Sequence, residues 1–277
     1  MPELPEVETV RLALDKIVKN ALVKKVEIYR YDLRWKVKDN LKVNLEKDIL
    51  KKPFRMGKYI LIPTIKNKIL LIHLGMSGQI KIQKKNHLKS KHDHIDIVVQ
   101  TENNLTYSIT YNDPRRFGFV DFFNKKDIYH HFLLKNLGIE ALSKELTVNK
   151  LKPLINNRKK NIKNTLIDQR VIAGIGNIYA SEILYRAKIH PKRSANSLSN
   201  QEVDTIIKAC RFILKKAIKV GGTTIKNHAQ PDGKLGYFSQ KLKVYGRTGQ
   251  KCFNCKNNII NMLITKRSTF YCDHCQI

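Results

Sequence analysis

The sequence predicts a multidomain α+β protein: an N-terminal β-sandwich with a flanking helix, a helical domain, and a C-terminal four-cysteine zinc ribbon. Residues 22–123 contain short apolar runs separated by turn signals, as in antiparallel sheets. After about residue 125 apolar residues recur at helical spacing, and the last forty residues hold four of the five cysteines. We therefore place the domain boundaries at 1–124, 125–236 and 237–277.

The first element is a helix in the stretch PEVETVRLALDKIV, whose apolar residues follow helical spacing. Pro5 suits a first helical position, and Glu6 and Glu8 suit the positive end of the helix dipole. A helix start does not explain Pro2 and Glu3, which precede it.

The strands expected next form an antiparallel sandwich or a barrel. The strand candidates are 58–63, 68–74, 79–83, 94–100, 105–111 and 117–123. The helix candidates are 126–136, 143–155, 177–188 and 201–220. Residues 221–238 read as a long Gly-containing loop, and loops of that length are often functional.

The cysteines form a C-x2-C…C-x2-C pattern with 16 residues between the pairs, a spacing typical of zinc sites. Four thiolates complete a tetrahedral shell, so the predicted zinc is structural and has no position left for water. Two disulfides are the weaker alternative. The fifth cysteine, Cys210, falls on an apolar helix face and suits the core. The ligands are Cys252, Cys255, Cys272 and Cys275.

Between the cysteine pairs, MLITKRSTFYC predicts a β-hairpin with Lys266 and Arg267 at its turn, where they can meet phosphate. Earlier, VIAGIGNIYASE places two glycines before a helix. A dinucleotide fingerprint is a poor match, because Tyr179 occupies the third glycine position and no acid follows at the required distance. A turn that binds a phosphate at the helix N-terminus, with Asn177 near the cap, fits better; an ordinary helix start stays open.

Charge is the strongest compositional feature. Lys and Arg outnumber Asp and Glu by 53 to 23, and the pI is near 10.0. Such a surface attracts a polyanion, usually nucleic acid, although a Lys-rich composition explains part of the excess. No stretch resembles a signal peptide or a membrane span, so we expect a cytoplasmic, reducing location without disulfides.

Several motifs occur in order along the whole chain: PELPEVET, HLGMSG, KHDH, DPRRFG, GIGNIYASE, GGTT…DG…GYF and the four-cysteine finger. In these the chain resembles the bacterial formamidopyrimidine-DNA glycosylases, also called 8-oxoguanine DNA glycosylase/AP lyases. The resemblance implies a β-sandwich, a helix–two-turns–helix domain and a zinc finger. It implies damaged double-stranded DNA as the partner, held in a cleft, and we expect a monomer.

The resemblance assigns catalysis to four residues. Once Met1 is removed, the secondary amine of Pro2 attacks the sugar carbon C1′ and forms an iminium, which also acidifies the C2′ proton. Glu3 moves protons, Lys58 contacts phosphate and donates a proton in β-elimination, and Arg267 acts in phosphate binding and δ-elimination. Glu6 either holds the N-terminus electrostatically or is only a helix-start residue.

The resemblance also implies that Met76, Arg115 and Phe117 fill the gap left by an extruded base, which fits a thioether, a guanidinium and a ring. Without the family context, core packing of Met76 and Phe117 is the plainer explanation. His92 and His94 share a strand face, but no further metal ligand is apparent. By resemblance these residues meet phosphates: His92, Arg158, Lys159 and Lys163.

The loop at 221–236 departs from the family. Many relatives have Arg-Asp-aromatic after GGTT-x, whereas this chain has Lys226, Asn227 and His228. The predicted activity is excision of oxidised purines from duplex DNA with β,δ-elimination. The alternatives are the sister branch that acts on oxidised pyrimidines and a non-catalytic zinc-ribbon DNA-binding protein.

Overall fold

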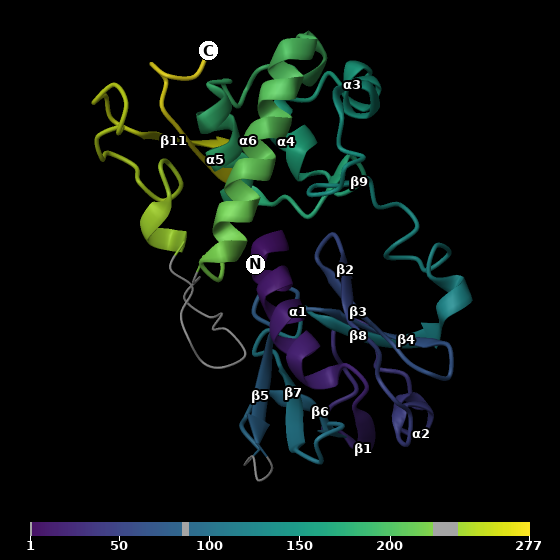
Figure 1. Cartoon of the computed structure of the whole chain (residues 1–277). Helices are drawn as coiled ribbons and strands as arrows, with labels where there is room; N and C mark the ends of the chain where they lie inside the picture. The colour runs from purple at the N-terminus through teal and green to yellow at the C-terminus, as the bar shows by residue number, and fades with distance from the viewer. Residues whose placement is uncertain (1, 85–88, 224–237) are drawn as a thin grey trace. The chain divides into compact units, whose positions relative to one another are not determined.

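The computed structural model describes residues 2–84, 89–223 and 238–277, and the chain divides into two compact units (Figure 1). Unit 1 comprises Met1–Lys135 and Val220–Ser239, and unit 2 comprises Asn136–Lys219 and Gln240–Ile277. This division does not decide the three predicted domain boundaries, which stay predictions.

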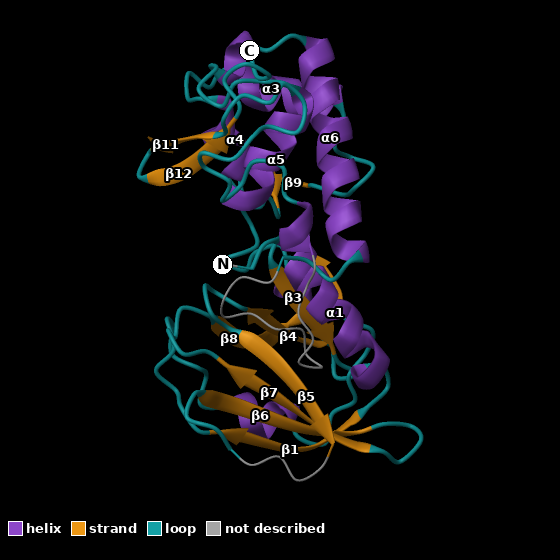
Figure 2. Cartoon of the chain, turned by 90° about the vertical axis from the view of Figure 1, so that its left-hand side faces the viewer, coloured by secondary structure: helices purple, strands orange, loops and turns teal. Residues whose placement is uncertain are grey.

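Unit 1 contains two four-stranded antiparallel sheets (Figure 2), in the orders β1-β6-β7-β5 and β2-β3-β4-β8. The strands of the first sheet are β1 (Leu22–Ile28), β5 (Gln79–Lys84), β6 (Asp93–Gln100) and β7 (Thr106–Asn112). Those of the second are β2 (Phe54–Met56), β3 (Tyr59–Pro63), β4 (Lys68–His73) and β8 (Phe119–Asn124). Two short helices also belong to this unit, α2 (Leu41–Leu45) and η1 (Lys125–Asp127).

One continuous apolar core joins the two sheets. It takes Val26 and Ile97 from the first sheet and Ile60, Ile72 and Val120 from the second. A core shared by two facing sheets is the arrangement of a β-sandwich. The predicted sandwich is therefore confirmed, and the barrel alternative is not.

The predicted N-terminal helix is α1 (Leu4–Val18). Its apolar side packs into the same core through Val7, Val10, Leu14 and Val18. Each fully buried aliphatic side chain contributes about 1.5–3 kcal/mol relative to exposure, so this face fixes the helix on the sandwich.

The helix expected at 126–136 is wrong. After η1 this segment makes successive turns, with both His131 N and His130 N donating to Asp127 O. Tertiary contacts override the helical spacing: His131 is buried, its Nε2 lies 3.0 Å from Asp121 Oδ2, and its ring stacks on Phe123.

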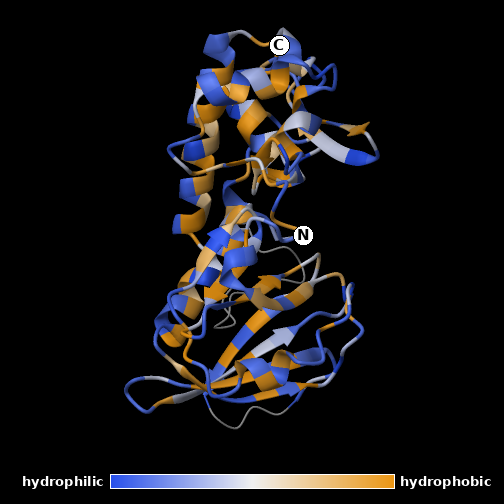
Figure 3. Ribbon diagram, turned by 90° about the vertical axis from the view of Figure 1, so that its right-hand side faces the viewer, coloured by the Kyte–Doolittle hydropathy of each residue, from blue (hydrophilic) through white to orange (hydrophobic). Residues whose placement is uncertain are grey.

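Unit 2 is helical apart from two small sheets. Its helices are α3 (Val148–Asn156), α4 (Ile162–Ile167), α5 (Asn177–Ala187), η2 (Ala195–Ser197) and α6 (Asn200–Lys219), and η3 (Phe238–Lys241) precedes the finger. The strands β9 (Ile139–Glu140) and β10 (Ile172–Ala173) pair in parallel. Along α6, hydrophobic and hydrophilic residues alternate in bands (Figure 3), and Cys210 lies on the buried side as expected.

The predicted finger hairpin is present as β11 (Ile260–Ile264) and β12 (Arg267–Tyr271), which pair antiparallel. Thr265 and Lys266 form its turn, both with positive φ, the backbone that a two-residue hairpin turn of the I′ type requires. Over the described ranges, no helix combines the length and the apolar character needed to cross a bilayer.

Candidate functional site

The N-terminus of α1 fixes the predicted nucleophile. Pro2 is buried, and Glu3 is 2 % exposed and caps the helix in an extended conformation. The backbone N–H of Glu3 donates to Glu6 Oε2 at 2.8 Å. The first turn of the helix thus holds the backbone next to Pro2 at the positive end of the helix dipole.

Glu6 also binds a distant part of unit 1. Its Oε1 accepts from Thr223 N at 2.8 Å and from Thr223 Oγ1 at 2.9 Å. Gly222 has φ +78°, and a Cβ there would lie 2.8 Å from Glu6 Oε1, so a side chain at this position would collide with the carboxylate. The amide of Phe238 donates to Gly222 O at 3.0 Å. Glu6 therefore connects the N-terminal residues to Gly222 and Thr223.

We expect Glu6→Gln to lower the free energy of unfolding by about 1–3 kcal/mol, because an amide places an NH2 group against one of these donors in either orientation. Borohydride trapping of the N-terminal amine on DNA should fall as well. Thermal unfolding and trapping of the same preparations check both effects. Glu27→Gln, which removes an equal charge from a half-exposed strand site with surface contacts to Lys25 and Tyr29, is the control; it should cost less than about 1 kcal/mol and leave trapping unchanged.

Lys58 lies in the turn between β2 and β3, after Gly57 with φ +56°. Arg55 ties this turn to α1, because its Nε contacts Glu8 Oε2 at 2.9 Å and its Nη1 donates to Gly57 O at 2.7 Å. Lys58 is 6 % exposed. Burial, reinforced by the positive charges of Lys58 and Arg34, lowers the pKa of His73 to about 4, so His73 is neutral at pH 7.

The predicted gap-filling residues lie together on unit 1. Met76 and Phe117 are 42 % and 41 % exposed, which excludes core packing for both. The guanidinium carbon of Arg115 lies 4.9 Å from the centroid of the Phe117 ring. All three line a cavity of about 610 Å³, which His73 borders. An exposed thioether, ring and guanidinium around one cavity suit insertion into a base stack.

His92 is half-buried, and its carbonyl accepts from Asp113 N at 3.1 Å. His94 is buried, with Nε2 2.7 Å from Asp113 O. In the part of the chain that the structure describes, the four cysteines form the one group of His, Cys, Asp or Glu arranged to hold a metal ion. The two histidines belong to no such group.

In unit 2, Lys163 and Asn177 meet on the hairpin. Lys163 is fully buried, and its Nζ donates to Ser268 O at 3.1 Å and to Thr269 Oγ1 at 2.6 Å. Asn177 Nδ2 donates to the same carbonyl at 2.9 Å. We expected Lys163 to contact a phosphate. Instead its buried ammonium group donates to residues of β12.

Asn177 begins α5 after Gly176, close to the cap as expected. Arg267, the first residue of β12, is exposed beside the anchored Ser268. Lys159 is also exposed.

Arg158 is held by an acid of its own unit, because it donates to Asp168 Oδ2 at 2.9 Å. Burial alone would raise the pKa of Asp168, but hydrogen bonds from Arg170 and Arg158 lower it to about 2. Asp168 is therefore ionised at pH 7, and the guanidinium of Arg158 is paired with this carboxylate.

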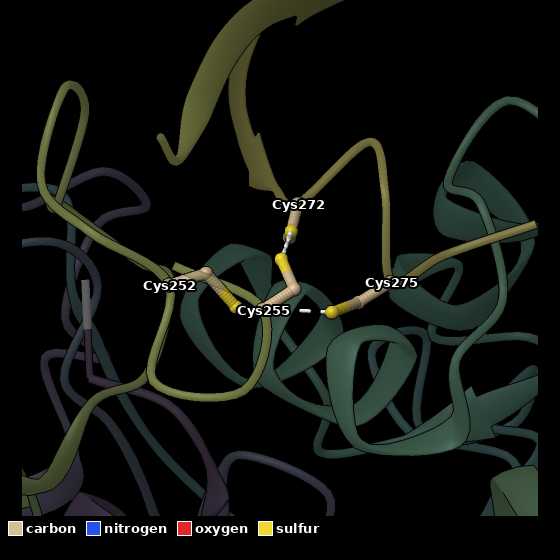
Figure 4. A group of neighbouring side chains, drawn as sticks. All are labelled: Cys252, Cys255, Cys272 and Cys275. Atoms are coloured by element: carbon tan, nitrogen blue, oxygen red, sulfur yellow. Dashed lines mark hydrogen bonds between the residues drawn. The ribbon is translucent and has the colours of Figure 1, made fainter. Parts of the chain in front are cut away.

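The four cysteine sulfurs converge in the finger (Figure 4), all within 4.8 Å of one another. Cys252 and Cys275 have sulfurs 3.8 Å apart, and those of Cys255 and Cys272 are 3.4 Å apart. These separations are too long for a disulfide and suit four ligands around one metal ion. Tyr185 Oη, from α5, lies 3.2 Å from Cys252 Sγ.

Comparison with known proteins decides the family. Residues 1–120 match the model of the formamidopyrimidine-DNA glycosylase N-terminal domain, and residues 137–229 match that of its H2TH domain. The formamidopyrimidine-DNA glycosylase of Rickettsia conorii is 43% identical over 277 residues, covering 100% of this chain and 99% of the relative. The chain belongs to the formamidopyrimidine-DNA glycosylase family. The predicted family and enzyme class are thereby confirmed.

Solved structures of formamidopyrimidine-DNA glycosylases share the fold. The Lactococcus lactis Fpg in complex with DNA that contains an abasic site has a TM-score of 0.89 at 30% identity, covering 99% of each chain. The MutM (Fpg) protein of Thermus thermophilus has a TM-score of 0.88 at 31% identity, covering 99% of this chain and 98% of that one. The predicted fold class, with its helix–two-turns–helix domain, is confirmed.

Several residues of this formamidopyrimidine-DNA glycosylase site carried no prediction from the sequence. His73 and Asp113 are the first letters of the motifs HLGMSG and DPRRFG, so the signal was present but no chemistry was attached to it. Glu182 accepts hydrogen bonds from the backbone amides of residues 243–245, which anchors the segment before the finger. The departing residues Lys226, Asn227 and His228 lie outside the described residues.

Proposed function

We propose that the chain excises oxidised purines, 8-oxoguanine and formamidopyrimidines, from duplex DNA and cleaves the strand by β,δ-elimination. The observation that carries this is the buried Pro2–Glu3 pair, fixed at the start of α1 by Glu6 in a chain of this family. After removal of Met1, the lone pair of the Pro2 nitrogen bonds to C1′ and the damaged base leaves with its bonding electrons and a proton. The first product is an N,O-acetal at C1′, and the covalent iminium forms when the C1′–O4′ bond breaks and O4′ takes up a proton.

Glu3 is positioned to exchange protons during attack and sugar-ring opening, since a carboxyl group beside the amine can act as general acid and base. The iminium withdraws electrons, so the C2′ proton is lost and the 3′ phosphate departs. Lys58, held near His73, contacts phosphate and donates a proton in this elimination. Arg267 promotes loss of the second phosphate. These roles are part of the proposal.

DNA recognition in this proposal uses the surface cations and the exposed triad. Met76, Arg115 and Phe117 occupy the space of the extruded base, whose removal from the stack costs a few kcal/mol. Lys163 supports phosphate binding indirectly. It holds the carbonyl of Ser268 and so helps to position the adjacent Arg267. The phosphate contacts come from His92, Arg158, Lys159 and the amide end of α5 at Asn177.

We propose that Cys252, Cys255, Cys272 and Cys275 bind one zinc ion. All four sulfurs are committed to the metal, so its contribution is folding of the finger rather than chemistry on the substrate. Tyr185 orients the Cys252 sulfur through its hydroxyl, in the way that outer partners fix metal ligands.

Borohydride trapping of the chain on a panel of duplexes tests the function. We expect adducts with 8-oxoguanine and formamidopyrimidine duplexes, and few with oxidised pyrimidines. Adducts on oxidised pyrimidines alone would favour the sister branch, and none on any lesion would favour a DNA-binding protein without chemistry. Binding should weaken with salt, with log K falling by about 0.9 per log unit of salt for each phosphate neutralised.

A further inference from the structure

Asp113 begins the segment DPRRFG between β7 and β8, and it is fully buried. Its Oδ1 accepts from Ser77 Oγ at 2.6 Å and lies 3.3 Å from Arg115 N. Its Oδ2 accepts from Gly118 N at 2.8 Å and lies 3.3 Å from Tyr111 Oη. Each of these four groups presents an N–H or O–H to the carboxylate.

The donors come from two separate segments. Ser77 lies in segment 74–78, which carries Met76. Arg115 and Gly118 lie in segment 113–118, which carries Phe117. Ser77 Oγ also links the two segments directly, because it accepts a hydrogen bond from Arg115 N at 3.1 Å. The Asp113 carboxylate is thus the common acceptor of both segments.

The backbones of these segments pack closely against their neighbours. Gly75 has φ +62°, and a Cβ there would lie 2.4 Å from the carbonyl carbon of Phe117. A Cβ on Gly118 would lie 1.5 Å from Tyr111 Oη. His94 Nε2 holds the Asp113 backbone from the other side, 2.7 Å from its carbonyl oxygen.

We propose that Asp113 is a positioning residue that fixes segments 74–78 and 113–118 against each other. Met76, Arg115 and Phe117 then enter the base stack as one preassembled wedge. Asp113 is buried beneath them and acts through Ser77 and the 115–118 backbone. This inference rests on the proposed function, because it assumes that the triad replaces an extruded base.

Asp113→Asn tests the proposal. The amide is nearly isosteric, yet its NH2 group must face donors on one side, so one segment loses its anchor. We expect base excision from a damaged duplex to fall on the order of 10- to 100-fold, as for a small misplacement of positioning groups. Discrimination between opposite bases should fall with it. Trapping on a single-stranded abasic site, which has no stack to enter, should stay within about 2-fold of wild type.

Ser77→Ala gives a second, milder test if Asp113→Asn does not fold, since it removes only the bridge between segments. It should show the same pattern with a smaller loss. Asp96→Asn is the matched control: Asp96 is also buried in the first sheet, but it accepts from Ser108 and Thr110, away from the wedge. It should leave the duplex-to-single-strand ratio and the opposite-base discrimination unchanged.

Equal losses on duplex and single-stranded substrates in Asp113→Asn and Ser77→Ala would overturn the positioning role. So would unchanged activity of both variants on the damaged duplex. Failure of the proposed function can be told apart from failure of the positioning role. In that case the wild-type chain itself would form no adduct with any damaged duplex.

Discussion

Blocking the amine of Pro2 will abolish the borohydride-trapped adduct, to below about 1% of the unblocked chain, because the nucleophile itself is lost. The sharpest version of this experiment uses one protein preparation that carries a cleavable N-terminal extension. Before cleavage the nitrogen of Pro2 is an amide and cannot attack C1′. After cleavage it is a secondary amine, and trapping should appear. Gel quantification of the adduct before and after cleavage checks this.

Two controls separate chemistry from folding. Pro5→Ala changes the other proline of the helix start without touching the terminal amine, so it should retain the adduct. Affinity for duplex DNA containing a stable abasic analogue should be similar before and after cleavage, since neither form needs the amine to bind. Full strand cleavage by the blocked chain would refute the covalent mechanism.

Removing the metal will unfold the finger. Structural zinc contributes on the order of 10 kcal/mol of binding free energy to small metal-dependent folds, and the hairpin has few apolar contacts to replace it. Cys272→Ser should therefore reduce bound zinc from one ion per chain toward none. It should increase amide hydrogen exchange in β11 and β12 and weaken DNA binding. Metal analysis by mass spectrometry and exchange measurements check these results.

Cys210→Ala is the matched control for the loss of a thiol. Cys210 is buried in α6 and lies outside the four-sulfur group, so the variant should keep its zinc and its affinity for DNA. A Cys272→Ser chain that kept the metal and an ordered hairpin would contradict the assignment.

The regular elements with long periodic patterns were predictable from the sequence. Alternating residues located most of the sandwich strands, and helical spacing located α1, α5 and α6. The segment at 126–136 also has apolar residues at helical spacing, but it forms turns because His131 contacts Asp121. No local pattern contains that information. The short α4 has too few turns to show a period.

The predicted site was limited in a similar way. Motifs located residues that carry chemistry, but they did not distinguish an exposed cation from a buried one. Lys159 and Lys163 look alike in sequence, yet Lys159 is exposed while Lys163 is enclosed against Ser268, 105 residues away along the chain. The roles of Asp113 and Thr223 depend on contacts between distant segments, which spacing cannot reveal.

The hydrogen bonds between Thr223 and Glu6 have a consequence for folding during translation. The amino end leaves the ribosome first, but the partner that secures it is translated 217 positions later. Until then, Glu6 lacks the two hydrogen bonds that it accepts from Thr223. The N-terminal residues therefore acquire their complete set of hydrogen-bond partners only after most of the polypeptide has been made.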